Sequence, residues 1–339
     1  MLGTLRLLLA LAVAASHANL RVGGLNPGVV AVIGFYLISG YVMAGLMRRH
    51  YSQIAQVPAF YLDRAIRLLP QYLFYAGLTL AWHLYSQVST PFLRSSPSPG
   101  DLLNNLLIAP LNYYMYNGSD HYTLIPPAWS LGAELQFYLL APFLLLWPKR
   151  MLAAGLLSLS VYLAALGGLI NSDWFGYRLL PGMLLFFLLG AWLQHQHQQR
   201  QHSRALAMTL GVAALAALAL GLLYRNGTLR QPYNFETLLG LILGLLLLHT
   251  LATRPRTRWD DLAGDLSYGV FLNHFFILWT LYPQGIGNAQ LPGFLALSIA
   301  ISWLSQRLVE QPLLKLRHQF RKSPAVCQTD KLQKNQSKS

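Results

Sequence analysis

The stretch MLGTLRLLLALAVAASHANL, residues 1–20, decides which kind of fold this chain can adopt. It is an apolar run long enough for a membrane-spanning helix, and it is interrupted by the ionisable side chains of Arg6 and His17. Their separation of eleven positions, at about 100° each, places both on nearly the same face of one helix. They lie roughly 16 Å apart along its axis, about half the hydrocarbon thickness of a bilayer. Because ionisable groups cost free energy inside a membrane, both are expected to have a function.

The composition is that of an integral membrane protein. Of the 339 residues, 54% are hydrophobic and only 11% are charged, whereas soluble domains have about 25% charged residues. The mean hydropathy is +0.39. The net charge of +14 comes from basic residues between apolar segments, where they orient the chain in a membrane, so no nucleic-acid partner is predicted. The single cysteine, Cys327, excludes a disulfide framework within the chain and a cysteine metal site.

The hydropathy pattern predicts an all-α, polytopic membrane protein with about ten transmembrane helices in one domain, residues 1–316. The first span also imitates a secretory signal peptide, but the topology requires it, so we expect that it is retained. Breakers such as Asn26-Pro27-Gly28 separate neighbouring spans. The predicted spans are roughly 2–20, 28–47, 68–88, 128–147, 151–170, 178–194, 205–224, 235–252, 266–282 and 291–309.

Lys and Arg are distributed unevenly between the two ends of these spans. Twenty of the 25 lie at the ends that include both termini, which the positive-inside rule places in the cytoplasm. Residues 317–339 are predicted to form a basic, disordered cytoplasmic tail near anionic lipid. On the outer side, the apolar piece 102–116 is too short to span, so we expect it either to re-enter the bundle or to lie in the interface. The five outer basic residues are Arg21, Arg94, Arg178, Arg225 and Arg230.

Polar side chains in or beside the other spans are candidates for a site, and each has a structural alternative. Arg64 and Arg67 are adjacent on one helix face at the mouth of the third span, where paired cations suit either phosphates or lipid headgroups. Glu134 is the only acid in the fourth span, and Tyr138 follows on the same side. The alternative for Glu134 is a structural ion pair inside the bundle.

Other polar positions favour packing roles. We expect Ser39 and Gly40 to let the second span approach the first closely. A hydrogen bond between helices is at least as good an interpretation of Asn273 and His274 as direct chemistry. The run QHQHQQRQH, residues 194–202, could hold a metal, but histidines among glutamines on a turn are typical of a solvated segment, so no metal is predicted. Tyr113, Tyr114 and Tyr116 could stack on sugar rings or belong to an interfacial aromatic belt, which is the better default.

Six elements resemble, in identity, order and spacing, the membrane acyltransferase-3 family, whose members O-acylate surface glycans and other acceptors. The resemblance covers all ten predicted spans and implies a multi-pass enzyme of the bacterial inner membrane. The elements are RLLLALAVAASH (6–17), GFYLISGYVM (34–43), FYLDRAIRLLPQY (60–72), PAWSLGAELQFYLLAP (127–142), LSYGVFLNHFFIL (266–278) and VEQP (309–312).

The resemblance assigns catalysis to His17, which would accept the proton of an acceptor hydroxyl as it attacks a thioester. A histidine bonded across helices for packing is the alternative. The family pattern also implies that Arg6, Arg64 and Arg67 bind the phosphates of cytoplasmic acyl-CoA, a co-substrate rather than a permanently bound cofactor. For Arg6 alone, a topology anchor is an equally good interpretation. Both direct transfer and an acyl-histidine intermediate are compatible with this arrangement.

By the same resemblance Glu134 belongs to the active site, where it would orient His17 or hold the acceptor hydroxyl. Trp129, Tyr138, His274 and Ser39 are the residues expected to bind the acceptor or to support the site. The predicted partners are acyl-CoA, a glycan or glycolipid acceptor and membrane lipids, and the acyl group is expected to be acetyl or another short chain.

Two other classes of protein compete with this interpretation. A secondary transporter or lipid-linked glycan translocator would use intramembrane charges to bind substrate or relay protons, although such proteins often have internal repeats and none is evident here. A haem protein could use His17 and His274 as axial ligands. Solute uptake without acyl-CoA would support the first, and a visible absorbance band would support the second.

Overall fold

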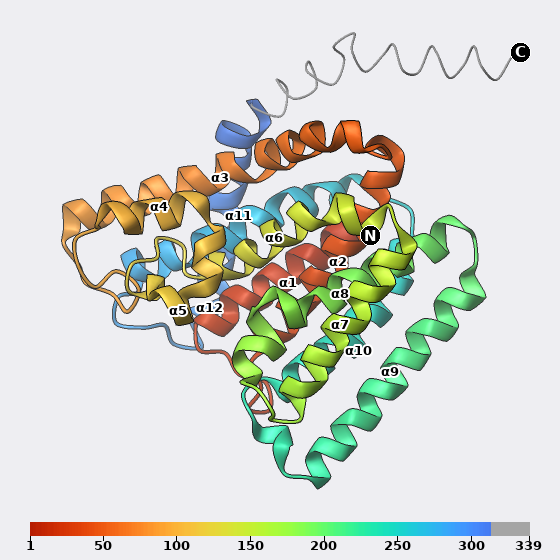
Figure 1. Cartoon of the computed structure of the whole chain (residues 1–339). Coiled ribbons are helices and arrows are strands. Elements are labelled where there is room, and N and C mark those ends of the chain that lie inside the picture. Colours follow the sequence, from red (N-terminus) through yellow and green to blue (C-terminus); the bar gives the residue numbers. More distant parts are fainter. Residues whose placement is uncertain (313–339) are drawn as a thin grey trace, which may run out of the picture.

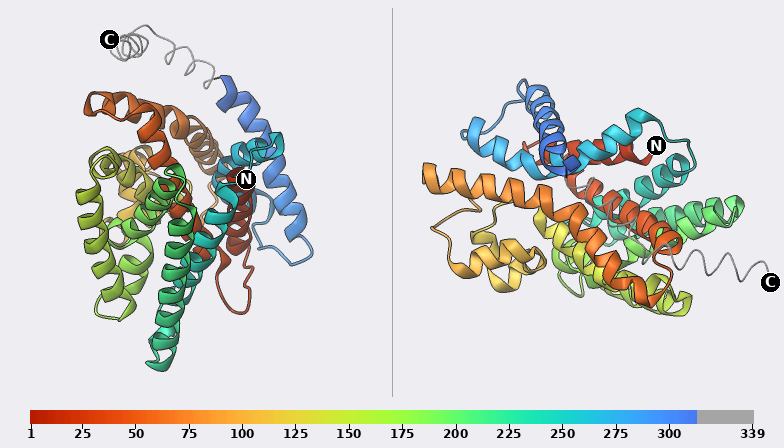
Figure 2. Two further views of the ribbon diagram at one scale, coloured as in Figure 1. Left: turned by 90° about the vertical axis from the view of Figure 1, so that its right-hand side faces the viewer. Right: turned by 90° about the horizontal axis from the view of Figure 1, so that it is seen from above.

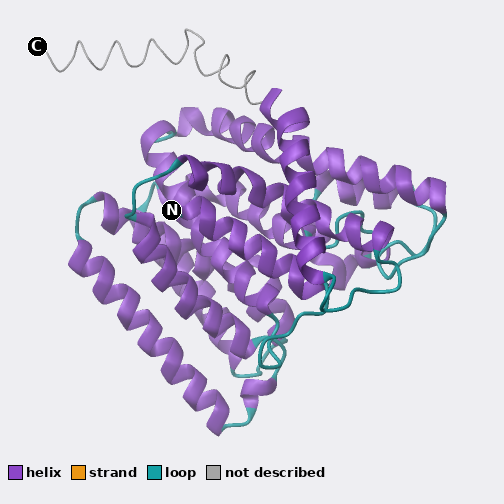
Figure 3. Cartoon of the chain, turned by 180° about the vertical axis from the view of Figure 1, so that it is seen from behind, coloured by secondary structure: helices purple, strands orange, loops and turns teal. Residues whose placement is uncertain are grey.

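The computed structural model describes residues 1–312, which form helices and no strand (Figures 1 and 3). The predicted tail, residues 317–339, and Cys327 lie outside the described residues. Two short helices, α4 and α5, and several turns of 3₁₀ or π helix connect the long ones. The helices are α1 Leu2–His17, α2 Pro27–His50, α3 Val57–Ser86, α4 Pro99–Leu107, α5 Tyr114–Asn117, α6 Ala128–Leu145, α7 Pro148–Leu166, α8 Leu180–Gln198, α9 His202–Arg225, α10 Asn234–Ala252, α11 Arg258–Leu281 and α12 Leu291–Ser305.

Each predicted span coincides with a helix, which confirms the all-helical fold. Within the described residues, six segments are long and apolar enough to cross a membrane. The helices α1 and α12 have only 16 and 15 residues, α11 carries charged residues in its first turn, and α3 carries Asp63, Arg64 and Arg67 after its first turn. The count of ten crossings and the side that each terminus faces therefore stay predictions. The six segments are Pro27–His50, Ala128–Leu145, Pro148–Leu166, Trp174–Gln198, His202–Arg225 and Asn234–Ala252.

Two helices begin earlier than the hydropathy pattern predicts. The third span was expected from residue 68 and the ninth from residue 266, but α3 begins at Val57 and α11 at Arg258. Hydropathy detects only the apolar part of a helix, whereas its start depends on capping. The Thr257 hydroxyl accepts a hydrogen bond of 3.2 Å from the backbone N–H of Asp260 and so caps α11. Helix α11 thus has a polar first turn before its apolar part, whereas in α3 the charged residues Asp63, Arg64 and Arg67 interrupt the apolar pattern after the first turn.

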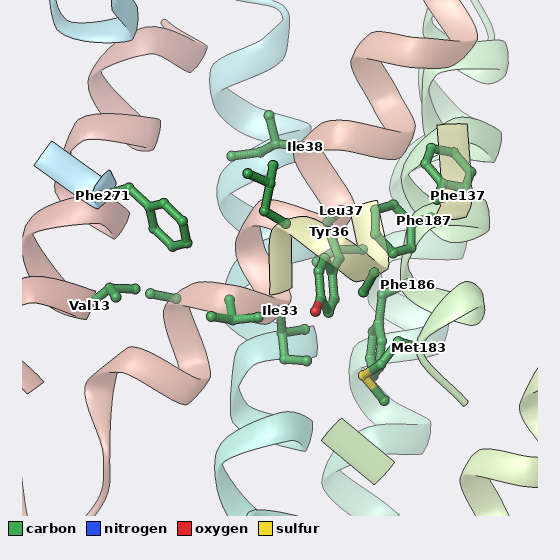
Figure 4. Packing of buried hydrophobic residues seen from close by; sticks show 14 of the residues in the cluster. Val13, Ile33, Tyr36, Leu37, Ile38, Phe137, Met183, Phe186, Phe187 and Phe271 are labelled. Carbon is green, nitrogen blue, oxygen red and sulfur yellow. The ribbon is translucent and has the colours of Figure 1, made fainter. Parts of the chain in front are cut away.

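Helix α2 lies at the centre of the bundle. In Figure 4, Ile33, Leu37 and Ile38 of α2 lie between Val13 and Phe271 on one side and a group of aromatic and sulfur-containing side chains on the other. In their most apolar windows, α2 and α8 are 67% and 72% buried, whereas α9 is 17% buried. Figure 2 shows α9 extending beyond the rest of the bundle, in agreement with its low burial. The group on the far side of α2 is Phe137, Met183, Phe186 and Phe187.

Close contact between α2 and α8 depends on glycine. A methyl group built on Gly40 would lie 1.8 Å from the backbone oxygen of Phe187, and one on Gly190 would lie 1.9 Å from that of Leu37. The expectation that Ser39 and Gly40 pack α2 against α1 is therefore wrong, because Gly40 faces α8 and Ser39 bonds to α6. Small residues let membrane helices approach closely, but sequence alone does not identify the neighbour.

Replacing Gly40 by alanine is expected to lower the stability of the bundle by about 1–3 kcal/mol, because the added methyl group collides with backbone rather than with a movable side chain. Thermal unfolding in detergent would measure the loss. Gly211→Ala in α9 is the matched control, since nothing lies within 4 Å of a methyl group there. Equal melting temperatures for the two variants would contradict the assigned packing.

The segment between α3 and α6 folds over one end of the bundle. The side chain of Asn105 donates to the carbonyl of Tyr122 at 2.9 Å and accepts from the N–H of Leu124 at 2.8 Å. The buried amide of Asn112 donates to the carbonyls of Trp129 and Arg178 at 3.1 and 3.0 Å. The segment is thereby fixed to the starts of α6 and α8. One face of α4 remains apolar and exposed, through Leu102, Leu103, Leu106 and Leu107.

Candidate active site

Three cavities follow one another through the bundle. The first, here called the arginine cavity, has a volume of about 110 Å³, and the second, the middle cavity, about 90 Å³. Val32, Ser130 and Phe271 line both of them. The third, the loop cavity, holds about 300 Å³ beneath the segment that precedes α6. The residues that line both the middle and the loop cavity are His17, Trp129 and Arg178.

The arginine cavity brings together the three arginines that sequence analysis singled out. Arg6 reaches it from α1, and Arg64 and Arg67 reach it from α3. The buried Nε atoms of Arg6 and Arg64 have no hydrogen-bond partner within residues 1–312. A desolvated guanidinium with an unused donor is costly, so these atoms suit an anionic ligand.

Carboxylates hold the two α3 arginines in place. Asp63 forms an ion pair with Arg64, and the buried Glu310 forms one with Arg67, while Asp265 of α11 lies 3.8 Å from Arg67. Glu310 is the acid of the VEQP element, so that element acts on the cavity by positioning Arg67. The VEQP element is recognisable in the sequence, but its partner is not, because 243 positions separate the two residues.

The start of α1 is also fixed. The N–H and hydroxyl of Thr4 donate to Asp260 of α11 at 2.8 and 3.0 Å, and the amino terminus donates to the carbonyl of Leu251 at 3.1 Å. The ends of α1, α10 and α11 therefore lie together, as the predicted topology requires. The same contacts set the rotation of α1 that turns Arg6 into the cavity.

Glu134 lies in the arginine cavity rather than beside His17. Its Oε1 accepts hydrogen bonds of 2.5 Å from the hydroxyls of Ser39 and Tyr138. In the described residues it forms no hydrogen bond or ion pair with His17, so the expectation that it orients this histidine is wrong. The relation between Glu134 and Tyr138 follows from their spacing of four residues on one helix, but the contact with Ser39 depends on how α2 meets α6.

The partner of His17 is His274. Nδ1 of His17 lies 3.0 Å from Nε2 of His274, and the rings stack with centroids 5.1 Å apart. His274 is fully buried, whereas His17 is exposed to the middle and loop cavities. The contact joins α1 to α11, so the helix-bridging interpretation holds for His274. Its neighbour Asn273 bridges α11 to α12. The Asn273 side-chain amide donates to the carbonyl of Ser298 at 2.9 Å, and the Ser298 hydroxyl donates to Oδ1 of Asn273 at 2.5 Å.

The hydrogen-bond partners determine the protonation of this pair. The carbonyl oxygen of Val270 lies 3.1 Å from Nδ1 of His274. A carbonyl only accepts, so a neutral His274 carries its proton on Nδ1 and accepts at Nε2. His17 must then donate from Nδ1. This leaves the Nε2 lone pair of a neutral His17 available on a ring that lines two cavities.

Trp129 was predicted to be a site residue and Arg178 was not, but the structure brings the two side chains together. The Arg178 guanidinium lies over the Trp129 ring, 4.7 Å from its centroid. Arg178 was counted only as one of the outer basic residues, although it lines the same two cavities as His17. A charged residue at the predicted edge of a span was the available signal, but such a residue is usually a topology anchor.

Only the second half of the histidine-rich run, residues 198–202, lies mostly exposed around a turn, so the expectation of a solvated segment is wrong for its first half. Helix α8 continues to Gln198, and Gln194 and Gln196 are buried. Nδ1 of His197 lies 3.1 Å from the Tyr41 hydroxyl, and its Nε2 lies 3.1 Å from Nδ1 of His249. The run therefore connects α8 to α2 and α10. In residues 1–312, no group of three or more His, Cys, Asp or Glu side chains has the arrangement of a metal site.

Apolar helices around a polar interior with adjoining cavities define the class: a multi-pass membrane protein. Residues 2–307 match the family described as Acyltransferase domain, so this chain belongs to the acyltransferase-3 family.

Across 329 residues, 86% of this chain, it is 26% identical to Nodulation protein 10 of Rhizobium leguminosarum bv. viciae, covering 83% of that protein. It is 37% identical to an uncharacterized protein of Aquifex aeolicus (strain VF5), over 57% of this chain and 90% of that protein. No solved structure matches.

Proposed function

We propose that this membrane acyltransferase takes a short acyl group from cytoplasmic acyl-CoA and transfers it to a hydroxyl of a glycan or glycolipid on the other side of the bacterial inner membrane. The observation that carries the proposal is the position of His17. It lies at the junction of the middle and loop cavities, and the middle cavity adjoins the one lined by arginines.

The arginine cavity supports acyl-CoA as the donor. Arg6, Arg64 and Arg67 supply cationic donors that suit a diphosphate, and two of their buried Nε atoms have no hydrogen-bond partner in the described chain. With the nucleotide held there, the thioester arm would pass Val32, Ser130 and Phe271 to reach the middle cavity. Glu134, with Ser39 and Tyr138, would then belong to the donor end, as a hydrogen-bond acceptor beside the arm.

The free Nε2 of His17 would act as the general base. It would take the proton of the acceptor hydroxyl while that oxygen attacks the thioester carbonyl. The carbon–sulfur bond would then break, and the leaving thiolate would receive the proton from the imidazolium, giving an ester and free CoA. The same nitrogen could instead attack the thioester and carry the acyl group. Trapping labelled protein after addition of labelled acetyl-CoA without acceptor would distinguish the two routes.

Comparison of cells that express the wild-type protein and the His17→Ala variant tests the proposal. Mass spectrometry of surface glycans and glycolipids is expected to find an acyl substituent that only wild-type cells add. An acyl substituent that both cell types add at equal protein levels would refute the role of His17, and spectra that do not differ from those of cells lacking the protein would refute acyl transfer. Uptake of a solute by reconstituted vesicles without acyl-CoA would support the competing transporter function.

His274 would position His17 by accepting its Nδ1 proton. His274→Leu removes this acceptor and is expected to lower kcat about tenfold, the effect of one lost hydrogen bond. His274→Gln offers an amide oxygen in its place and is expected to restore part of the rate. Rates of CoA release for the two variants, at matched folded protein, check this. Equal loss in both would indicate that the ring is needed only for packing.

A further inference from the structure

Arg178 is the residue near His17 to which no role has been given. It is the last residue of a π turn, Trp174–Arg178, and lies inside the bundle with only 15% of its side chain exposed. Four aromatic rings lie within 5.7 Å of its guanidinium carbon. Such rings attract a cation and hold it in one place without satisfying its N–H groups. The four rings belong to Tyr114, Trp129, Tyr177 and Tyr233.

One carboxylate contacts this guanidinium. Nε of Arg178 donates to Oδ1 of Asp173 at 2.7 Å, and Asp173 is itself partly exposed. In the described residues the two terminal nitrogens form no hydrogen bond with protein. These nitrogens present parallel N–H donors that match two oxygens of a carboxylate or phosphate. Asp173 thus fixes the orientation of the guanidinium and leaves its bidentate edge available.

The cavity around Arg178 suits the acceptor rather than the donor. Arg178 and His17 both line the middle and loop cavities, and neither lines the arginine cavity. A molecule that reaches His17 from the loop side therefore lies against Arg178. The loop cavity, of about 300 Å³, adds aromatic side chains from Phe92, Tyr114 and Phe275. Its one acidic residue, Asp120, is 42% exposed and lies 3.9 Å from Arg94, which balances its charge.

We propose that Arg178 binds an anionic group of the acceptor, a carboxylate or a phosphate, and so selects acidic glycans or glycolipids. This rests on the proposed acyl transfer only in naming the ligand as the acceptor. The bidentate contact places the acceptor in the loop cavity with a neighbouring hydroxyl directed at His17. A neutral acceptor fills the same space but leaves the terminal nitrogens of Arg178 without an anionic partner, which costs binding free energy.

Binding of three simple probes to the full-length protein in lipid nanodiscs tests the proposal. Methyl β-D-glucuronide, methyl β-D-glucoside and methyl β-D-glucoside 6-phosphate differ only at the sixth carbon. Calorimetry on the wild type is expected to give at least about tenfold tighter binding of an anionic probe than of the neutral one. Preference for the uronide alone identifies a carboxylate ligand, and preference for the phosphate alone identifies a phosphorylated one. Absence of any preference overturns the proposal without the need for a variant.

Variants then assign the preference to this residue. Arg178→Gln is expected to abolish it, and Arg178→Lys to retain part of it, because the ammonium keeps the charge but loses the planar pair of donors. Arg230→Gln, an exposed arginine at the same predicted end, is the matched control and should change nothing. Preference that persists in Arg178→Gln overturns the assignment.

The same titrations with His17→Ala protein keep this proposal distinct from the proposed function. That variant should retain the preference while it loses acyl transfer. Acyl transfer that survives in His17→Ala would refute the catalytic role of the histidine, whereas loss of the anion preference in that variant would overturn the Arg178 site.

Discussion

Replacement of His17 by alanine is expected to lower the rate of acyl transfer by at least about 100-fold, the usual contribution of a general base. The expected loss is large because His17 is the only ionisable side chain shared by the middle and loop cavities apart from Arg178, within the described residues. Acyl-CoA-dependent release of free CoA, or acylated product measured by mass spectrometry, would give the rate.

The fold should survive this change. His17 is exposed to the cavities, and its hydrogen bond to His274 joins two helices that also meet through close contact of Gly3 with the backbone of Asp260. Expression and melting temperature are therefore expected to stay near the wild-type values. His50→Ala, on the exposed end of α2, is the matched histidine control. Undiminished transfer by the His17→Ala variant would leave the proposed mechanism without its base.

Replacement of Arg6 by glutamine is expected to weaken acyl-CoA binding about 10- to 150-fold, which corresponds to the loss of 1.5–3 kcal/mol from a hydrogen bond to a charged group. The reason is that Arg6 lines the same cavity as Arg64 and Arg67, and its buried Nε has no hydrogen-bond partner in the described part of the protein. A higher KM for acyl-CoA, with little change in kcat at saturation, is the expected signature.

Arg49 provides the comparison for Arg6. It lies exposed near the end of α2, at the same predicted end of the bundle, and does not line the arginine cavity. Arg49→Gln should leave the KM for acyl-CoA unchanged. If both variants raised it equally, a general effect of positive charge at the membrane surface would explain the result better than a phosphate site.

The carboxylates that contact the arginines determine which arginine should contribute most to acyl-CoA binding. Glu310 forms an ion pair with Arg67, so it limits how far this arginine can turn toward a ligand. Arg6 has no such partner among the described residues. The largest single effect on acyl-CoA binding is therefore expected at Arg6, a ranking of the three arginines that depends on their tertiary contacts.

Which residues share one face of a single helix could be predicted from the sequence, because the helical repeat is a local property of the chain. Arg6 and His17 lie on one face of α1 because a helix repeats every 3.6 residues, and they do line successive parts of the cavity system. The relation of Glu134 to Tyr138 has the same local origin. Hydropathy likewise located every long helix, since the apolar length needed to cross a bilayer is a property of the chain alone.

Contacts between remote helices could not be predicted in this way. His17 and His274 are 257 positions apart, and Glu134 meets Ser39 only because α2 crosses α6. The contact between α2 and α8 depends on glycines that would allow close approach of any neighbouring helix, so the sequence does not identify α8 as the partner of α2. Each of these pairings is set by how several apolar surfaces fit at once, which no single span specifies.

The sequence by itself determined an all-helical membrane protein with a cation and an imidazole along one side of its first helix, because hydropathy and helical repeat act within a segment. Only the tertiary structure decided that His274 is the partner of His17, that Glu134 belongs with the arginines, and that Arg178 shares the cavities of the histidine. These depend on which helices come together, and that is fixed by the packing of the whole bundle.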